Sequence, residues 1–592
     1  MTQDGADVTT AEQESKETLR RILAALDGRC NFKLEAGAGA GKTYSLIDTL
    51  HYVMRNRQKY LPGDGQRVAC ITYTNVARNE IIRRTDGSPY IFAATIHGFL
   101  WEAISRFRKP ILQEIVAMPS WSSLLEGRTS LHGCDVSYDL GFRGIEENTI
   151  HLHHDDVPAL AIRLFANQKF RYLVADRFPI ILVDEYQDTP SGLAEAMLGN
   201  RSATSTESTY GFFGDHWQQI YDRTCGSIDH LPVEGIPKRA NWRSSRAVIN
   251  LLNNMRPELP QAPVADAKCG SVTVYHTNNW TGPRGVRSKK GQIPDHVLKQ
   301  TLAWVTEDSC RRHGRGSGSS VQAKVLMLTH SSIANELGFG GIDKAFKRNE
   351  DYVRKNDDVV AFLLDILEPT CAYFADKKYG PMFDLLKRSR PRMRKRSDKS
   401  GWVELFDEIN AARNKGSVGD VIDIVLNQKY FALPRSIVSR QRNWELAHKD
   451  LVDAQDISEP RRLVEYGKFR NVSYREVVAL HRYVEENTPF STQHGVKGAE
   501  YPSVLAVFGG WNLYNFPDML ANFPRRDALS DEDRKRFVRS RNLFYVACSR
   551  AQHDFALLFT TELSRGALQT LKEWIGESNI VDVQYSPEGA PI

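Results

Sequence analysis

A short glycine-rich stretch at residues 37–43, which reads GAGAGKT, has the clearest chemical potential in this sequence of 592 residues. Its glycines let the backbone approach a phosphate without a Cβ in the way, and successive N–H groups then form a site for an anion. The loop leads into a predicted helix, whose N-terminus adds partial positive charge. In such a P-loop, Lys42 would reach the β- and γ-phosphates of a nucleotide and the Thr43 hydroxyl would bind Mg²⁺.

This P-loop departs from the strict pattern at one position, because Ala36 occupies the place of the first glycine. Short motifs also occur by chance, and a glycine-rich turn without a ligand is the alternative interpretation. A P-loop ATPase needs further parts, so the rest of the sequence decides between the two interpretations.

An acidic pair after an apolar segment is the second part that such an enzyme needs. Residues 179–183 (PIILV) predict a buried strand, and Asp184 and Glu185 follow it directly. Asp184 would hold the Mg²⁺ shell, and Glu185 would orient and deprotonate the attacking water. An exposed acidic turn is the alternative, and the presence of a P-loop makes it less plausible.

Three further segments contain groups that suit a bound nucleotide. Gln218 follows a predicted strand at residues 210–213 and can report a γ-phosphate by hydrogen bonding. Arg243 can reach transferred phosphate charge, and the neighbouring Trp242 can stack on a base. Gln13, in a predicted helix at residues 10–26, has an amide that suits the N6 and N7 edge of adenine. Without a P-loop nearby it would be an ordinary surface glutamine.

Predicted strands and helices alternate in this part of the chain, with further strands at residues 67–73 and 91–95. Such alternation predicts an α/β fold with a parallel sheet. Ligands of these sheets collect at the carboxyl ends of the strands. The polar residues that fall at these ends are equally well explained as helix caps or turn residues; they are Thr72, Thr74, Asn75, Thr95 and His97.

The overall composition is that of a folded and mildly basic protein. With 41% hydrophobic and 25% charged residues it is not a disordered chain, and its net charge of +6 permits a polyanionic partner. The length predicts about four domain-sized units. The polar start is neither a signal nor a transit peptide, and no apolar run could span a bilayer, so we expect a cytoplasmic protein without a membrane partner. Eight singly spaced cysteines indicate reduced thiols, not disulfides or a zinc site.

The segment HLHHDD at residues 151–156 invites interpretation as a metal site. It directly precedes an apolar-periodic helix, so Asp155 and Asp156 are better explained as cap residues that interact with the helix dipole. Neither zinc spacing nor supporting partners are visible around it.

Taken together, the ordered motifs resemble those of the UvrD/Rep/PcrA helicases of superfamily one. The similarity includes Ala36, which that family usually has, and it extends over almost the whole chain. Eight motifs in the family's order are far more specific than any one of them. They are Gln13 with AGAGAGKT, ITYTNVARNEI from Ile71, ATIHGF from Ala94, LVDEYQDT from Leu182, GDHWQQIY from Gly214, NWRSS from Asn241, STQHGVKGAE from Ser491 and LFYVACSRA from Leu543.

The resemblance implies two RecA-like P-loop lobes, in which parallel sheets are flanked by helices, with ATP and Mg²⁺ in the cleft between them. Arg243 and Arg550 of the second lobe would be arginine fingers, and Gln218 would couple loss of the γ-phosphate to lobe movement. Thr43 and Asp184 would bind the metal. Residues at the nucleotide would be Gln13, Ala36, Gly37, Ala38, Gly39, Ala40, Gly41, Lys42, Thr43, Tyr44, Trp242, Arg243, Glu500 (near the ribose) and Arg550, and those on single-stranded DNA would be Thr74, Asn75, His97, Tyr221, Thr492 and His494.

The resemblance also implies a mainly helical insertion in each lobe. The second insertion contains a basic run at residues 387–396, which suits phosphate contacts or a solvated loop equally well. The first lobe would comprise residues 1–100 and 173–240 around an insertion at 101–172, and the second lobe residues 241–345 and 486–592 around an insertion at 346–485.

Some positions depart from the family pattern. After Tyr221 the family usually has a second aromatic, whereas this chain has Asp222 and Arg223. Base stacking contributes about 1–3 kcal/mol, so either Tyr221 and Trp217 do the stacking or coupling to DNA is weak. Asn542 stands where an Arg is common. After residue 559 only a short tail remains, so we expect any nuclease activity to come from a partner.

The first interpretation is an ATPase that translocates on single-stranded DNA with 3′–5′ polarity and opens tailed duplexes. The second is a DNA- or nucleotide-sensing regulatory ATPase subunit, with little unwinding of its own. The chain's size, its short first insertion and Tyr186 resemble the helicase-like subunit of Gabija-type anti-phage systems, in which an OLD-family nuclease partner cuts DNA. A third interpretation, a small-molecule kinase, leaves residues 494–500 and Arg550 unexplained.

Overall fold

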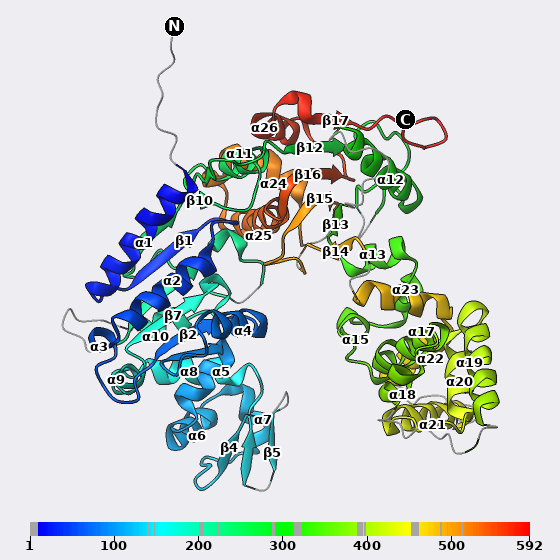
Figure 1. The fold of residues 1–592 in the computed structure, drawn as a ribbon, viewed down its shortest axis with the longest axis horizontal. Coiled ribbons are helices and arrows are strands. Elements are labelled where there is room, and N and C mark those ends of the chain that lie inside the picture. The colour runs from blue at the N-terminus through cyan, green and yellow to red at the C-terminus, as the bar shows by residue number, and fades with distance from the viewer. Residues whose placement is uncertain are drawn as a thin grey trace.

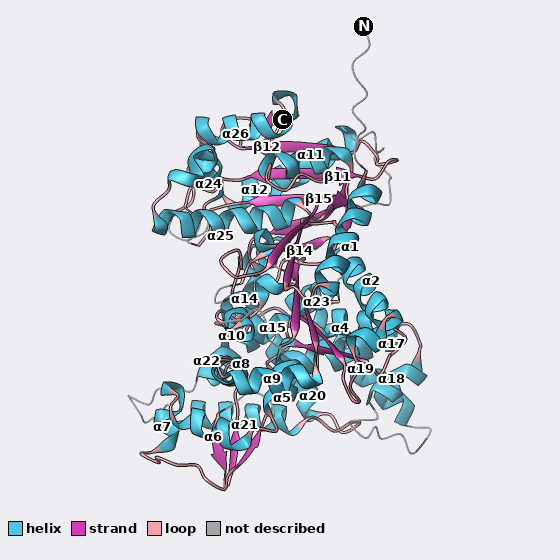
Figure 2. Ribbon diagram, turned by 90° about the vertical axis from the view of Figure 1, so that its left-hand side faces the viewer, coloured by secondary structure: helices cyan, strands magenta, loops and turns pink. Residues whose placement is uncertain are grey.

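The computed structural model describes residues 10–138, 143–146, 148–199, 207–221, 224–286, 290–312, 323–386, 395, 398–450, 461–485, 488–493, 495–510 and 513–592, and their side chains except at 448–450. Two parallel sheets flanked by helices form two lobes, the first at the left of Figure 1 and the second at its top. Figure 2 shows the strands of one sheet above those of the other. The predicted fold class is confirmed.

The first lobe is built on a six-stranded sheet with the order β3-β2-β7-β8-β1-β9, in which every neighbouring pair is parallel. Its central strands are apolar without alternation because helices cover both faces of such a sheet. The predicted strands at 67–73, 91–95 and 210–213 are confirmed to within a few residues. The strands are β1 Phe32–Ala36, β2 Val68–Thr72, β3 Ile91–Thr95, β7 Ile180–Asp184, β8 Thr209–Gly214 and β9 Glu234–Lys238.

The helices of this lobe begin where the sequence has turn and cap residues. Thr10 and Gln13 form a capping box at the start of the first helix, and Thr74 and Thr95 cap two others. The helices are α1 Ala11–Asp27, α2 Lys42–Arg55, α3 Arg57–Tyr60, α4 Asn75–Arg84, α5 Ile96–Ile104 and α10 Leu193–Leu198, with 3₁₀ turns η2 Tyr186–Asp188 and η3 His216–Gln218.

The chain after α5 forms a small insertion that shares a hydrophobic core with the first lobe, for example through Trp121 and Leu160. It contains a three-stranded sheet of order β4-β6-β5 that the sequence did not predict. Its elements are α6 Arg108–Val116, η1 Pro119–Trp121, α7 Ser122–Leu125, β4 Asp135–Ser137, β5 Gly144–Glu146 and β6 Thr149–His151, followed by α8 Asp156–Phe165 and α9 Gln168–Arg177.

The expected capping role of the HLHHDD segment is wrong in detail. Asp155 lies at the N-cap of α8 but its side chain makes no cap hydrogen bond. Asp156 is fully buried, lies 2.8 Å from the Arg143 guanidinium and accepts a hydrogen bond from the His153 N–H. A buried carboxylate needs such partners, and Arg143 was not visible as one in the sequence. Among the described residues, no group of three potential ligands is placed to hold a metal ion.

The second lobe is built on another six-stranded parallel sheet, of order β14-β13-β15-β16-β12-β17. Its strands are β12 Ser271–His276, β13 Lys324–Met327, β14 Phe490–Thr492, β15 Tyr501–Phe508, β16 Ala551–Phe559 and β17 Ile580–Asp582. Its helices are α11 Arg246–Met255, α12 Asp295–Arg312, α13 His330–Leu337, α24 Phe516–Asn522, α25 Asp531–Cys548 and α26 Arg565–Ile575, with 3₁₀ turns η7 Phe523–Ala528 and η8 Glu577–Asn579. Two short strands, β10 Ala240–Asn241 and β11 Ala262–Pro263, pair where the chain enters this lobe.

A helical insertion between β13 and β14 lies at the right of Figure 1. Its core is continuous with one face of the second sheet, because Val325 and Leu505 pack in the same cluster as its helices. The basic run at 387–396 lies outside the described residues except for Lys395. The helices are α14 Gly340–Ala345, α15 Asn349–Val353, α16 Asp358–Phe362, the π-helical turn η5 Leu363–Leu367, α17 Glu368–Ala375, α18 Tyr379–Leu386, α19 Asp398–Lys415, α20 Val418–Asn427, α21 Arg435–Asp450, α22 Arg461–Arg470 and α23 Tyr474–Val484.

The eight cysteines are all free thiols, as their spacing predicts. Within the described part of the chain, none of the helices is both long and apolar enough to cross a bilayer.

Candidate functional site

A cavity of about 890 Å³ lies between the lobes, and residues from distant parts of the sequence line it together. Of the residues expected at a nucleotide, only Gln13 and Ala36 are absent from its lining. The predicted site residues that do line the cavity are Gly37, Ala38, Gly39, Ala40, Gly41, Lys42, Thr43 and Tyr44 from the first lobe and its P-loop, Glu185 and Gln218 from its strand ends, and Trp242, Arg243, Glu500 and Arg550 from the second lobe.

The P-loop connects the end of β1 to the start of α2 and is held from the second lobe. The Ala38 N–H donates to the Tyr545 hydroxyl over 3.3 Å, and the Trp242 N–H donates to the Gly39 carbonyl over 2.9 Å. Gly39 has a left-handed φ of 77°, and a Cβ there would lie only 2.7 Å from Asn241 Oδ1. A side chain at residue 39 would therefore be strained and would also push the second lobe away.

The acidic pair lies at the carboxyl end of β7. Glu185 Oε1 is 3.7 Å from Lys42 Nζ, and Glu185 Oε2 accepts a 2.6 Å hydrogen bond from Gln187 Nε2. Burial raises the pKa of Asp184, and the neighbouring Glu185 charge raises it further. Burial acts to raise the pKa of Glu185, but Lys42, Lys497, the hydrogen bond from Gln187 and Arg550 together outweigh it, so the net pKa of Glu185 is lowered. Glu185 is therefore the ionised member, as a proton acceptor must be.

The backbone of Glu185 has a left-handed φ of 50°, which side-chain-bearing residues rarely adopt. Its N–H donates to Asp184 Oδ1 over 3.0 Å, which ties the two acids together. Such strain is concentrated at functional sites, and here it turns the Glu185 side chain towards Lys42.

Two arginines of the second lobe face this pair. Arg243 Nε donates to Glu500 Oε2 over 2.6 Å, and Arg550 is almost fully buried, with one NH group 3.3 Å from Gln218 Oε1. Burial lowers the pKa of Arg550, and the nearby Arg243 lowers it further. Arg243 has Glu500 as its anionic partner, whereas among the described residues no carboxylate lies within 4.0 Å of Arg550, so a phosphate would supply its missing counter-charge.

Gln218 connects the two lobes at the cavity. Its Nε2 donates to Asp215 Oδ2 over 2.7 Å, while its Oε1 accepts from Arg550. Lys497 of the second lobe donates to the Gln218 carbonyl over 2.7 Å and to Asp188 Oδ2 over 2.5 Å. Sequence reasoning quoted Lys497 within a motif but gave it no partner, because its contact with the first lobe is not visible in a sequence.

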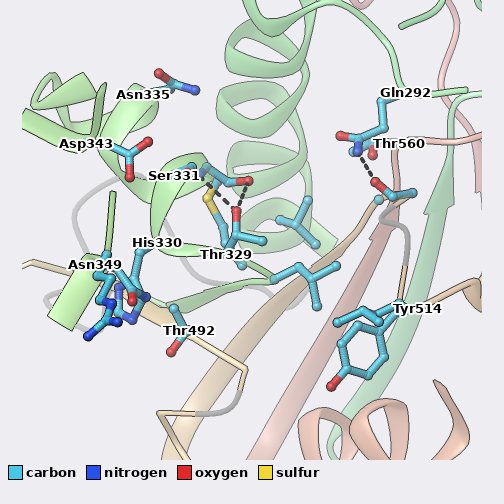
Figure 3. Close-up of a pocket in the computed structure, with 18 of the residues that line it drawn as sticks. Gln292, Thr329, His330, Ser331, Asn335, Asp343, Asn349, Thr492, Tyr514 and Thr560 are labelled. Atoms are coloured by element: carbon cyan, nitrogen blue, oxygen red, sulfur yellow. Dashed lines mark hydrogen bonds between the residues drawn. The ribbon is translucent and has the colours of Figure 1, made fainter. Parts of the chain in front are cut away.

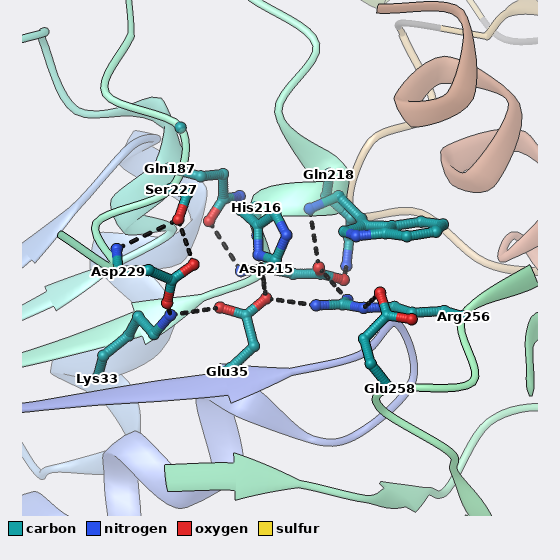
Figure 4. Close-up of polar contacts among 12 residues, drawn as sticks. Lys33, Glu35, Gln187, Asp215, His216, Gln218, Ser227, Asp229, Arg256 and Glu258 are labelled. Atoms are coloured by element: carbon teal, nitrogen blue, oxygen red, sulfur yellow. Dashed lines mark hydrogen bonds and ion pairs between the residues drawn. The ribbon is translucent and has the colours of Figure 1, made fainter. Parts of the chain in front are cut away.

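A buried polar network lies beneath this junction (Figure 4). Arg256, at the C-terminal end of α11 in the second lobe, forms ion pairs of 2.7 Å with both Asp215 and Glu35 of the first lobe. Glu35 also lies 2.8 Å from His216 Nδ1 and accepts a 2.6 Å hydrogen bond from the Tyr186 hydroxyl. Burial alone would raise the pKa of Glu35, but His216 and Arg256 outweigh burial and hold it below its usual value. This network was not predicted.

Replacing Arg256 by methionine should destabilise the fold by about 3–5 kcal/mol, because Glu35 and Asp215 would remain buried without their shared cation. The measurement is the melting temperature and the urea midpoint of the purified variant. Arg20→Met is a matched control, since Arg20 forms an exposed pair with Glu17, and it should melt like the parent. Equal melting of both variants would show that Arg256 does not stabilise the junction.

One end of the cavity presents flat aromatic surface. Trp242 is 48% exposed and Tyr44 is 63% exposed, and Trp242 Nε1 donates to Ser15 Oγ over 3.2 Å. The side chain of Gln13 instead accepts a 2.8 Å hydrogen bond from the Thr10 N–H and completes the helix cap. Both rings therefore line the cavity, whereas Gln13 does not.

The expected DNA-contacting residues that the structure describes lie at or just after the carboxyl ends of the strands. Tyr221 stacks on Tyr73, with 5.6 Å between ring centroids, and Lys497 lies 5.5 Å above the Tyr221 ring. Tyr73 is thus a second aromatic beside Tyr221 that the sequence comparison of this motif overlooked. Asp222, Arg223 and His494 lie outside the described residues.

Some of the other residues expected to contact DNA already form hydrogen bonds or ring contacts within the protein. Thr74 Oγ1 caps α4 through the Ala77 N–H at 3.2 Å, and Thr492 Oγ1 accepts from the Gly495 N–H at 3.0 Å. Asn75 is exposed in the first turn of α4, and the His97 ring lies 4.6 Å from that of His154. The cap role that the sequence left open is therefore real for Thr74, and Thr492 makes a comparable turn contact that was not anticipated.

A second cavity, of about 880 Å³, begins at Tyr221 and Thr492. In Figure 3, Thr329, His330 and Thr492 lie at the left, and Gln292, Tyr514 and Thr560 at the right. Thr329 caps α13 at the carboxyl end of β13, and Lys347 and Arg348 of the helical insertion reach the same space. The cavity thus joins a strand-end surface of the second lobe to cationic residues of the insertion.

The fold and the first cavity are those of two RecA-like lobes with a P-loop between them, and they resemble the UvrD-like helicases. Residues 21–223 match a family model described as an AAA domain. The chain is also 23% identical to the Gabija protein GajB of Bacillus cereus (strain HuB5-5), over 707 aligned positions that cover 96% of this chain and 98% of the relative. The resemblance inferred from the motifs is thereby confirmed.

Proposed function

We propose that the protein hydrolyses ATP between its two RecA-like lobes and uses the energy to translocate on single-stranded DNA with 3′–5′ polarity. The observation that supports it best is the single cavity in which the P-loop, Glu185, Gln218, Arg243 and Arg550 meet. The proposal assigns residues 1–100 and 173–240 to the first lobe, 241–345 and 486–592 to the second, and 101–172 and 346–485 to their insertions.

In this proposal the P-loop N–H groups and Lys42 bind the phosphates, and Thr43 and Asp184 bind Mg²⁺. A hydroxyl and a carboxylate are the hard oxygen donors that Mg²⁺ prefers, and the ion would neutralise phosphate charge. Glu185 accepts the proton of the attacking water as the oxygen bonds to the γ-phosphorus. The bond from that phosphorus to the bridging oxygen then breaks, and the electron pair leaves with ADP.

The arginine fingers and Gln218 couple this step to lobe movement. Arg243 and Arg550 stabilise negative charge on the transferred phosphoryl group. Once that charge has left, Arg550 and Lys497 form hydrogen bonds with the first lobe through Gln218 and Asp188 alone among the described residues, and less attraction holds the lobes together. Opening of the lobes would move Thr492 and His494 of the second lobe relative to the first lobe, which contains Thr74, Asn75 and His97. A DNA strand bound to both lobes would then be displaced.

Autonomous motor activity has a direct test. ATP turnover by the purified protein should rise on addition of single-stranded DNA, and a duplex with a 3′ tail should be opened whereas one with a 5′ tail should not. ATP turnover that does not change on addition of DNA, or a 3′-tailed duplex that stays closed, would contradict the motor proposal. Neither result would contradict ATP hydrolysis itself.

Replacing Tyr221 by alanine should weaken binding of single-stranded DNA by about 5–150-fold, the equivalent of about 1–3 kcal/mol for one stacked base. Fluorescence anisotropy with labelled oligothymidylate would measure it. Tyr90→Phe is a suitable control, because Tyr90 is a similarly exposed aromatic residue away from the Tyr73–Tyr221 pair. Turnover without DNA should change little, and unchanged affinity would remove Tyr221 from the DNA-binding residues.

A second candidate function is supported by the likeness to GajB over nearly the whole chain. In it the protein is the DNA- or nucleotide-sensing ATPase subunit of an anti-phage complex and acts with an OLD-family nuclease. Co-expression with the neighbouring gene product, followed by size-exclusion chromatography, tests it. A protein that runs alone in the presence of such a nuclease would contradict this role.

A further inference from the structure

A second lysine lies against the P-loop, and it belongs to none of the motifs above. Lys238 is the last residue of β9, is 1% exposed and lines the nucleotide cavity. Its Nζ donates to the Gly41 carbonyl over 3.1 Å and to Ser45 Oγ over 2.6 Å. It therefore touches both the last glycine of the loop and the first turn of α2.

Lys238 and Lys42 both lie at the C-terminal end of the P-loop, but their ammonium groups face different neighbours across the nucleotide cavity. Lys42 Nζ points to Glu185, at a distance of 3.7 Å. A Cβ on Gly41 would lie 3.5 Å from the Trp242 ring and 3.7 Å from Lys238 Nζ, so Lys238 is at the end of the cavity where Trp242 and Tyr44 expose their rings. If a base stacks there and the γ-phosphate lies near Glu185, Lys238 is close to the phosphate attached to the nucleoside.

The charge of Lys238 has little compensation within the protein. Among the described residues it forms no ion pair within 4.0 Å, and its two hydrogen-bond acceptors are neutral. Burial lowers the pKa of Lys238 to about 8, and Asp48 of α2 acts in the opposite direction. The other charged side chains lining this end are Glu12 and Lys16 of α1 and Arg84 of α4. A buried cation of this kind costs stability unless an anion joins it.

We propose that Lys238 is a nucleotide-binding residue: its ammonium group pairs with the phosphate nearest the nucleoside, and its hydrogen bonds fix Gly41 at the start of α2. This inference rests on the proposed function, because it takes a nucleotide to occupy the cavity. Since AMP, ADP and ATP share that phosphate, Lys238 should contribute equally to the binding of each. Lys42, whose ammonium group faces Glu185, should matter most for the triphosphate.

The test compares Lys238→Met, which keeps the length of the side chain and removes its charge, with Lys42→Ala and the parent. Titration with fluorescent ADP and with a non-hydrolysable ATP analogue, both with Mg²⁺, measures affinity. Lys238→Met should weaken both ligands by the same factor, about tenfold or more, as expected for hydrogen bonds to a charged group. Lys42→Ala should weaken the triphosphate more than the diphosphate.

The melting temperature without nucleotide separates a binding role from a structural one. Because Lys238→Met removes a buried charge together with two hydrogen bonds to neutral acceptors, the variant should melt within about 5 °C of the parent while it binds nucleotide less well. Lys59→Met is the control, since Lys59 of α3 is exposed and pairs with Asp27 at the C-terminal end of α1. It should change neither affinity nor melting.

Two outcomes would overturn the assignment of Lys238 alone. One is unchanged ADP affinity in Lys238→Met, and the other is weak binding together with a melting temperature lowered by more than about 5 °C. Both leave the proposed ATPase intact, provided that the parent binds the ATP analogue and Lys42→Ala does not. A parent protein that binds neither ligand would overturn the proposed function and this inference together.

Discussion

Replacing Glu185 by glutamine should lower ATP turnover by about 10²–10⁴-fold, the usual contribution of a positioned general base, while nucleotide binding remains. The amide has the same shape as the carboxylate but cannot take the proton of the attacking water. Glu185 is the acid with the lowered pKa, 3.7 Å from Lys42, so it is ionised in the parent and ready to accept a proton. The comparison of steady-state phosphate release between variant and parent measures the loss.

The same substitution should preserve, and even strengthen, binding of ATP with Mg²⁺. The Glu185 charge is one reason why the pKa of Asp184 is raised, so its removal makes Asp184 a better anionic ligand. It also removes a negative charge beside the γ-phosphate. Glu195→Gln on α10 is the matched control, because Glu195 is partly exposed and pairs only with His230. Turnover within tenfold of the parent would exclude Glu185 as the base.

Much of this site was predictable because its parts are local in the sequence. A glycine-rich loop between a strand and a helix, and an acidic pair after an apolar strand, can each be recognised from neighbouring residues. The parallel sheet then brings Gly41 and Glu185 together, since the carboxyl ends of its strands share one edge. The resemblance placed Arg243 and Arg550 at the same cavity.

The parts that were not predictable depend on contacts between the lobes. Arg256 and Lys497 reach Asp215 and Asp188 across the junction, and nothing in a segment's own sequence identifies its partner in another lobe. For Gln13, by contrast, the contact that the sequence interpretation overlooked is a local one. Its amide suits adenine, but the backbone N–H of Thr10 is three residues away and takes the same oxygen to complete a capping box.

Replacing Arg243 by alanine should lower ATP turnover about 10³-fold, at the lower end of the range for arginine fingers. In the structure Arg243 is held by Glu500 Oε2 at 2.6 Å and by the Ser549 carbonyl at 3.2 Å, facing the cavity. A phosphoryl group carries more negative charge than the Glu500 carboxylate. We therefore expect the Arg243 guanidinium to turn towards a bound phosphate while the Arg243 backbone stays in place. Pre-steady-state phosphate release at saturating ATP measures the chemical step directly.

Arg243 gives a cleaner test than Arg550. Arg550 is buried and donates to the carbonyls of Val546 and Ala499, so its truncation would also leave acceptors without partners. Arg243→Ala leaves the Ser549 carbonyl and the Glu500 carboxylate, and Glu500 is 48% exposed and can be solvated. The matched control is Arg246→Ala, three residues further on and outside the cavity, which should hydrolyse ATP like the parent. If Arg243→Ala loses less than tenfold in the chemical step, Arg243 is a partner of Glu500 and Arg550 acts as the finger alone.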